Sequence, residues 1–303
     1  MRTAIAVLAA LCAALCFATG SLIQQGAARQ THARALRLGL LVALAHERRW
    51  LGGVALTVFS FGLQAAALAF GPLALVQPLA ATEVLFALPL IAHRNRRPLT
   101  RKSIIGGLGV TTGMALFVAV SPPTSGVSAP GLAAWVPALV GIATLTALSA
   151  FVALRVRGPA RVMWLATAAA VIYALLDAVT KSTVDLLPTR GAGVLTTWEP
   201  YALIAAGIIG ALFGQSAFHA GPLSLSLPVI DTVEPVFAVI LAAAVFHESL
   251  ARSPWQLALQ LVGGAIAVAG IALLSHSSVV LTEERRESGP ALSEQARASQ
   301  LHR

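Results

Sequence analysis

Among the polar side chains inside apolar stretches of this 303-residue sequence that are long enough to cross a membrane, six ionisable residues and one glutamine are the candidates for chemistry. A charged residue at the centre of a membrane-spanning helix costs about 2.5–3.5 kcal/mol on insertion, so each such residue is a candidate for binding or proton transfer. The candidate substrate-binding or ion-binding residues are Glu83, Asp177, Lys181, Gln215, His219, Asp231 and Glu234.

Glu83, Asp231 and Glu234 have no obvious cationic partner in their own apolar stretches. The first two follow Pro78 and Pro228, and a proline removes one backbone hydrogen bond from a helix. Free carbonyls beside carboxylates suit a hard cation such as Mg²⁺, whereas buried carboxylic acids also serve as proton carriers. We therefore predict a site at the membrane midplane centred on these three acids, and the residues alone leave both the metal ion and the proton open.

The other four candidates each have a second interpretation. Asp177 and Lys181 are four residues apart on one helix face, so they either neutralise each other or line a pathway. His219 either binds the solute or bonds to a backbone carbonyl. Gln215 either lines a path or forms hydrogen bonds between helices, as do three other glutamines in the apolar stretches. Those three are Gln24, Gln64 and Gln77.

The elements that must position these residues are membrane-spanning helices. Apolar residues make up 57% of the chain and charged residues 11%, with a mean hydropathy of +0.81. That composition excludes a water-soluble domain, and the sequence predicts an all-α integral membrane protein with nine or ten transmembrane helices. A tenth apolar run at 36–45 is too short to cross alone, so it is a half-helix or an interfacial helix. The nine longer runs fall at about 4–28, 50–70, 73–92, 103–120, 131–154, 163–187, 201–220, 222–246 and 256–276.

The net charge of +9 is carried largely by short connections between apolar runs, which orients helices in a membrane and does not predict nucleic-acid binding. Two connections are basic and two, around 121–130 and 188–200, are nearly neutral. We therefore expect a multi-pass protein of the cell membrane with a cytoplasmic C-terminus, a disordered cytoplasmic tail at 277–303, and an N-terminus on either side. The basic connections contain Arg94, Arg96, Arg97, Arg101 and Lys102, and Arg155, Arg157 and Arg161.

An internal repeat divides the chain into residues 1–120 and 131–276. Gly71-Pro72-Leu73 recurs 150 residues later as Gly221-Pro222-Leu223, and Pro78 recurs as Pro228. Alternation of the connections places the two Gly-Pro turns on opposite membrane sides, so the repeats are predicted to be inverted, an architecture common in secondary transporters. Close helix contact through glycine is also expected. At a spacing of 157 residues, Gly106, Gly107 and Gly113 match Gly263, Gly264 and Gly270.

The second repeat resembles the closing segment of EamA-type domains of the drug/metabolite transporter superfamily. The resemblance lies in residues 234–239 (Glu-Pro-Val-Phe-Ala-Val), residues 246–250 (Phe-His-Glu-Ser-Leu) and the glycines from 263 to 270. The first half, through Gly71-Pro72-Leu73 and residues 76–79, is more similar to the NIPA-like branch, described as magnesium transporters. The first repeat departs from the pattern because it has Arg94 where the second has Glu248. The resemblance implies two inverted halves that carry a small solute.

The predicted function is therefore secondary transport of a small solute or cation by alternating access across the lipid bilayer. The alternative is a NIPA-like transporter of Mg²⁺ or another divalent cation. An intramembrane enzyme is less favoured, because the chain has no nucleophile elbow of the Gly-x-Ser-x-Gly type and no phosphate-binding glycine loop. A non-transporting scaffold is less favoured, because it would leave the buried acids unexplained. We expect no enzymatic activity and no cofactor, and the sequence leaves the oligomeric state open.

Overall fold

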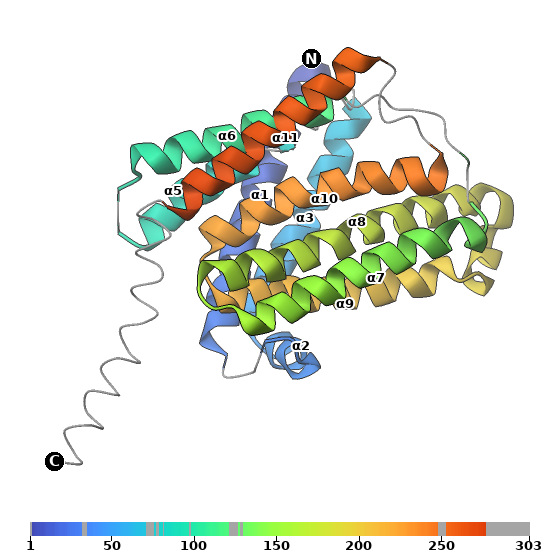
Figure 1. Ribbon diagram of the computed structural model, residues 1–303, viewed down its shortest axis with the longest axis horizontal. Coiled ribbons are helices and arrows are strands. Elements are labelled where there is room, and N and C mark those ends of the chain that lie inside the picture. Colours follow the sequence, from blue (N-terminus) through green and yellow to red (C-terminus); the bar gives the residue numbers. More distant parts are fainter. Residues whose placement is uncertain are drawn as a thin grey trace, which may run out of the picture.

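The computed structural model describes residues 2–31, 35–70, 76, 79–80, 82–96, 98–120, 127, 130–247 and 253–276. Across these residues the secondary structure is helical throughout (Figure 1). The Gly71-Pro72-Leu73 turn, Gln77, Pro78, Glu248 and the tail at 277–303 lie outside the described residues. The helices are α1 (Arg2–Gln30), α2 (Leu38–Ala45), α3 (Arg48–Phe70), α5 (Glu83–Arg94), α6 (Arg101–Ala119), α7 (Leu132–Arg155), α8 (Pro159–Arg190), the 3₁₀ helix η1 (Gly191–Thr196), α9 (Glu199–Ala220), α10 (Leu223–Phe246) and α11 (Pro254–Ser275).

Eight of the described helices are long and apolar enough to cross a membrane, which confirms a multi-pass membrane protein. They match eight of the nine predicted long runs, and the described part of the ninth run, 73–92, contains most of α5. Large apolar side chains such as Leu154 on α7 and Leu261 on α11 are exposed on the bundle surface. Exposed leucines on spanning helices are expected where the surrounding solvent is lipid.

The matched glycines bring α6 and α11 into direct backbone contact, as predicted. A methyl group on Gly113 would lie 2.5 Å from the carbonyl oxygen of Gly263, and one on Gly106 would lie 2.9 Å from the carbonyl oxygen of Gly270. Side chains larger than hydrogen would separate the two backbones, so glycine is required there. The later glycine of α6 meets the earlier glycine of α11, so the two helices are antiparallel.

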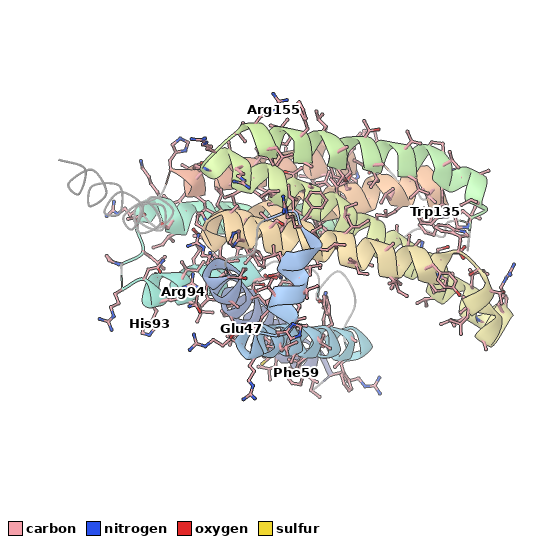
Figure 2. All side chains as sticks on the ribbon, turned by 90° about the horizontal axis from the view of Figure 1, so that it is seen from below. Glu47, Phe59, His93, Arg94, Trp135 and Arg155 are labelled. Carbon is pink, nitrogen blue, oxygen red and sulfur yellow. The ribbon has the colours of Figure 1, made fainter. Side chains whose placement is uncertain are left out.

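Hydrogen bonds at one end of the bundle fix the directions of the helices. Gln25, near the end of α1, bonds to the Gly221 carbonyl after α9 and to Arg94 at the end of α5. A methyl group on Gly221 would collide with Val162 in the first turn of α8. The basic connections at 94–102 and 155–161 lie at this end, which we call the basic end, and the opposite end is the neutral end. Figure 2 shows Arg94 and Trp135 toward opposite ends of the molecule.

The short helix α2 does not cross the bundle. The Gln24 amide donates to the Thr57 hydroxyl at 2.9 Å, and Phe17 packs edge-on against Phe61, so α3 runs antiparallel to α1. Because α1 ends and α3 begins at the basic end, α2 lies at that end, where it packs against α9 and α3. This confirms the prediction for the run at 36–45. In this arrangement α1 starts at the neutral end and α11 ends at the basic end.

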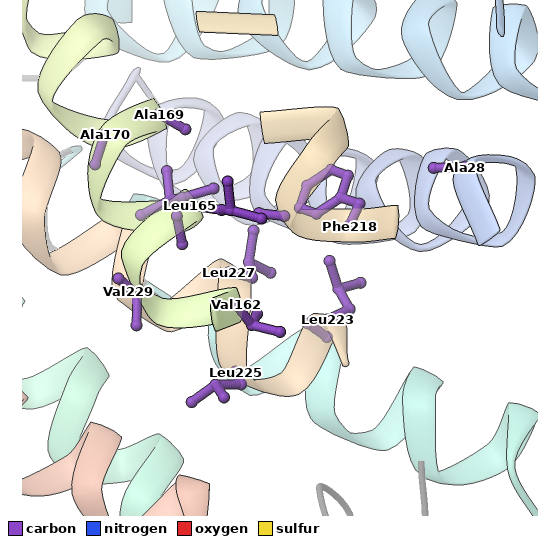
Figure 3. Close-up of a cluster of buried hydrophobic side chains, with 14 of the residues drawn as sticks. Ala28, Val162, Leu165, Ala169, Ala170, Phe218, Leu223, Leu225, Leu227 and Val229 are labelled. Carbon is purple, nitrogen blue, oxygen red and sulfur yellow. The ribbon is translucent and has the colours of Figure 1, made fainter. Parts of the chain in front are cut away.

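The bundle contains three closely packed helix pairs, α1 with α3, α6 with α11 and α8 with α9; α10 packs mainly on α8, and α5 packs on α1 and α6. Figure 1 shows the α1–α3 pair crossing the α8–α9 pair at a large angle. Toward the basic end the space around α10 is filled with apolar side chains, drawn in Figure 3. Every residue of α10 from Leu223 to Ile230 is buried, and partial exposure begins at Asp231. The first candidate acid on α10 thus lies where this apolar packing ends.

Candidate functional site: a cluster of four carboxyl groups

Four of the predicted acids lie close together, with Glu83 buried, Asp231 and Glu234 half-buried and Asp177 exposed. Glu83 is the first residue of α5 and lies close enough to Asp231 and Glu234 on α10 for their charges to interact. Asp177 on α8 is hydrogen-bonded to Glu234. The structure therefore brings together the three acids at which the site was centred and adds Asp177. We call Glu83, Asp177, Asp231 and Glu234 the carboxyl cluster.

The carboxyl cluster lies near the middle of the membrane-spanning layer. Asp231 is about 12 Å along α10 from Leu223 at the basic end, and Glu83 is about 16 Å along α5 from Arg94. The hydrocarbon core of a bilayer is about 30 Å thick, so both acids lie roughly halfway across it.

Several polar groups in or beside the cluster lack a hydrogen-bond partner among the described residues. Glu83 is only 8% exposed, and its buried Oε1 atom has no hydrogen-bond partner among the described residues. The buried Thr232 hydroxyl has none either. Pro235 has no N–H to donate to the Asp231 carbonyl one turn earlier. A water, an ion or a polar solute group can supply the partner that such a buried polar atom lacks.

Tyr173 belongs to the same region, although the sequence analysis did not include it. Its ring fills a groove on α9, where a methyl group on Gly214 would lie 2.6 Å from the tyrosine Oη atom. Tyr173 lies close enough to Glu234 for the carboxylate charge to act on its hydroxyl. The sequence could have identified Tyr173 by its position four residues before Asp177, which places both on the same face of α8.

Lys181 lies beyond the cluster, toward the neutral end. Its Nζ atom is 4.2 Å from the centre of the Phe246 ring, a cation–π arrangement. Phe246 in turn packs edge-on against Trp135, and Trp135 against Trp198. The hydrogen bond of Asp177 to Glu234 is a partnership that the four-residue spacing from Lys181 did not predict.

Gln215 and His219 lie between the cluster and the basic end, where α9 meets α1. The Gln215 amide donates to Gln24 Oε1 at 2.8 Å, and the His219 Nδ1–H donates to the Ala28 carbonyl at 2.6 Å. Both contacts correspond to the second interpretation of these residues, in which they link helices. The buried Oε1 atom of Gln215 has no hydrogen-bond partner among the described residues, so it remains able to accept a bond.

A preformed multidentate metal site is not found in the described part of the chain. No group of three or more histidine, cysteine, aspartate or glutamate side chains there has the geometry to hold a metal ion.

The sequence analysis did not identify Gln25 or Arg94 at the basic end as candidate functional residues. A glutamine pair at 24–25 inside an apolar helix was the signal that could have identified the first.

Comparison with known proteins identifies a homologue without a known function. The chain is 29% identical over 287 residues to an uncharacterized protein of Corynebacterium glutamicum, and the alignment covers 93% of this chain and 98% of that protein. No protein-family model matches the chain. No solved structure matches it either. The chain is thus a multi-pass helical membrane protein with an uncharacterized bacterial homologue along nearly its whole length.

Proposed function

We propose that this protein is a secondary transporter of the drug/metabolite type, which moves a small solute by alternating access and couples its movement to protons at the carboxyl cluster. The hydrogen bond between Asp177 and Glu234 carries this proposal. Ionised carboxylates only accept hydrogen bonds, so a bond between two carboxyl groups needs a proton on one of them. A proton held there at mid-membrane is what a proton-coupled carrier binds and releases.

The α6–α11 contact supports the predicted inverted repeat, an architecture common among transporters that work by alternating access. The 157-residue spacing of the repeat equates Gly106 with Gly263 and Gly113 with Gly270. Under that equivalence the contact of Gly106 with Gly270 becomes the contact of Gly263 with Gly113, and both contacts are present. A two-fold axis that exchanges two antiparallel helices lies perpendicular to them, hence in the membrane plane. Transporters with this symmetry bind substrate near the midplane.

The basic end is the cytoplasmic side in this proposal. Short connections rich in arginine and lysine remain in the cytoplasm, and both basic connections lie at this end. The segment after α11 is then cytoplasmic as well, and α1 starts on the outer side.

The second candidate function is transport of Mg²⁺ or another divalent cation, as the resemblance to the NIPA-like branch implies. Four carboxyl groups from three helices and the Asp231 carbonyl, which Pro235 leaves without its helical partner, are oxygen ligands of the kind such ions prefer. A divalent ion would replace the proton shared by Asp177 and Glu234 only after the carboxyl groups had moved, because no three of the described acids are placed to hold an ion. The two candidates therefore differ in what neutralises the cluster.

Reconstitution of the full chain into liposomes separates the two candidates. One set of vesicles contains a pH-sensitive dye and receives a panel of amino acids, organic amines and sugars. A second set contains a Mg²⁺-sensitive dye and receives Mg²⁺. We expect a solute-driven change in internal pH that is lost in Asp177→Asn and kept in the matched control Asp185→Asn on the same helix. Mg²⁺ entry without proton movement would favour the second candidate. The absence of both signals would contradict the transport proposal.

A further inference from the structure

We propose that Gln25, Arg94 and the Gly221 carbonyl form a latch that keeps the basic end of the bundle closed, so that the carboxyl cluster is reached from the neutral end. This inference rests on the proposed transport function, because a closed end matters only if the other end opens. The latch joins α1 and α5 of the first repeat to the turn between α9 and α10 of the second.

Gln25 is the centre of the latch because it uses both ends of its amide. The side chain is fully buried, and its Nε2 atom donates to the Gly221 carbonyl at 3.1 Å. Its Oε1 atom accepts a hydrogen bond of 2.5 Å from Arg94 Nη2. Arg94 Nη1 also donates to the Leu22 carbonyl at 3.1 Å, which holds the guanidinium against α1.

Neighbouring contacts close the same end. The His219 ring bonds to the Ala28 carbonyl, and the Leu36 backbone N–H donates to the Ser216 hydroxyl at 2.9 Å. Between the cluster and the basic end, α10 has no accessible side chain, because every residue from 223 to 230 is buried. Asp177, by contrast, is exposed, and it lies one turn of α8 beyond Tyr173 in the direction of the neutral end. The cluster is thus separated from the basic end by buried side chains, and its one exposed carboxyl group is that of Asp177.

The latch differs in kind from the contact that joins α6 to α11. The glycine contact is a close-packed backbone interface, and α6 and α11 would lose that packing if they slid or separated. The latch consists of hydrogen bonds from side chains, which exchange for bonds to water when the helices separate and so cost little to open. A rocking motion about the α6–α11 contact would therefore break the latch first.

The test measures access to the apolar packing from the basic end. Cys12 and Cys16 are replaced by alanine, and Ser226→Cys places a single thiol at a fully buried position of α10. A membrane-impermeant maleimide is added on the side of the basic end. We expect slow labelling in the otherwise unchanged chain and labelling at least about tenfold faster in Gln25→Leu and in Arg94→Ala.

Matched controls isolate the latch from general loosening. Gln64→Leu changes a glutamine of α3 and Arg96→Ala changes an exposed arginine two residues after Arg94; both should leave the rate unchanged. Arg94 is itself exposed, so its variant keeps the test valid if Gln25→Leu does not fold. Unchanged rates in both latch variants, equal acceleration in the controls, or fast labelling of the starting chain would each overturn the latch. Faster labelling without any solute flux would overturn the transport proposal alone.

Discussion

Gly113 of α6 and Gly263 of α11 touch backbone to backbone, and a methyl group on either would lie within 2.6 Å of the other residue's carbonyl oxygen. The contact of Gly106 with Gly270 has the same form. Helices that meet in this way are held by packing and not by the hydrophobic effect, since lipid solvates their outer faces equally well. The α6–α11 pair therefore resists separation during a transport cycle.

The first prediction concerns this contact. Gly113→Leu should force the two backbones apart and lower stability by roughly 1–3 kcal/mol, the usual range for overpacking. The matched variant Gly264→Leu adds the same side chain one residue away from the contact, where a methyl group would meet no atom within 4 Å. Thermal unfolding in detergent measures both, and equal midpoints for the two variants would contradict the packing described.

The second prediction concerns topology. Reporters that are active on only one side of the membrane, fused after Gly158 and after Gly193, should report inside and outside respectively. A third reporter after the C-terminal residue should report inside. The reason is that Gly158 lies at the basic end and Gly193 at the neutral end of α8. An exported C-terminus would mean that the membrane orientation is reversed.

The third prediction concerns the shared proton of Asp177 and Glu234. Infrared spectra of the purified protein at neutral pH should contain the carbonyl stretching band of a protonated carboxylic acid. The band should weaken in Glu234→Gln and stay in Asp185→Asn, which leaves the cluster intact. It should disappear at alkaline pH, as the shared proton is lost. A band of full strength in Glu234→Gln would show that the proton is held elsewhere.

Much of the fold follows from the sequence because membrane helices are encoded locally. Runs of about 20 apolar residues identified the helices, and the short run at 36–45 was too short to cross, as the structure confirms. The boundaries of α7, Leu132–Arg155, differ by one residue from the predicted 131–154. The repeat also predicted close contact of glycines, although not that Gly106 would meet Gly270.

The site was predictable only in its residue types. Insertion cost identified Glu83, Asp231 and Glu234 individually. The partnership of Asp177 with Glu234 joins residues 57 positions apart, and Gln25 and Gly221 are 196 apart. The pattern of residues along one helix does not predict which residues of a second helix it contacts. These pairs were therefore found only in the three-dimensional structure.

The measurement that tests the account most directly is solute-driven proton movement in vesicles containing the Glu83→Gln, Glu234→Gln double variant. These substitutions keep the shape and hydrogen-bonding capacity of the side chains but remove two titratable groups of the carboxyl cluster. We predict that the variant inserts and folds as the unchanged chain does, with solute flux that no longer moves protons or no flux at all. Proton-coupled flux at the rate of the unchanged chain would contradict the assignment of the cluster as the transport site.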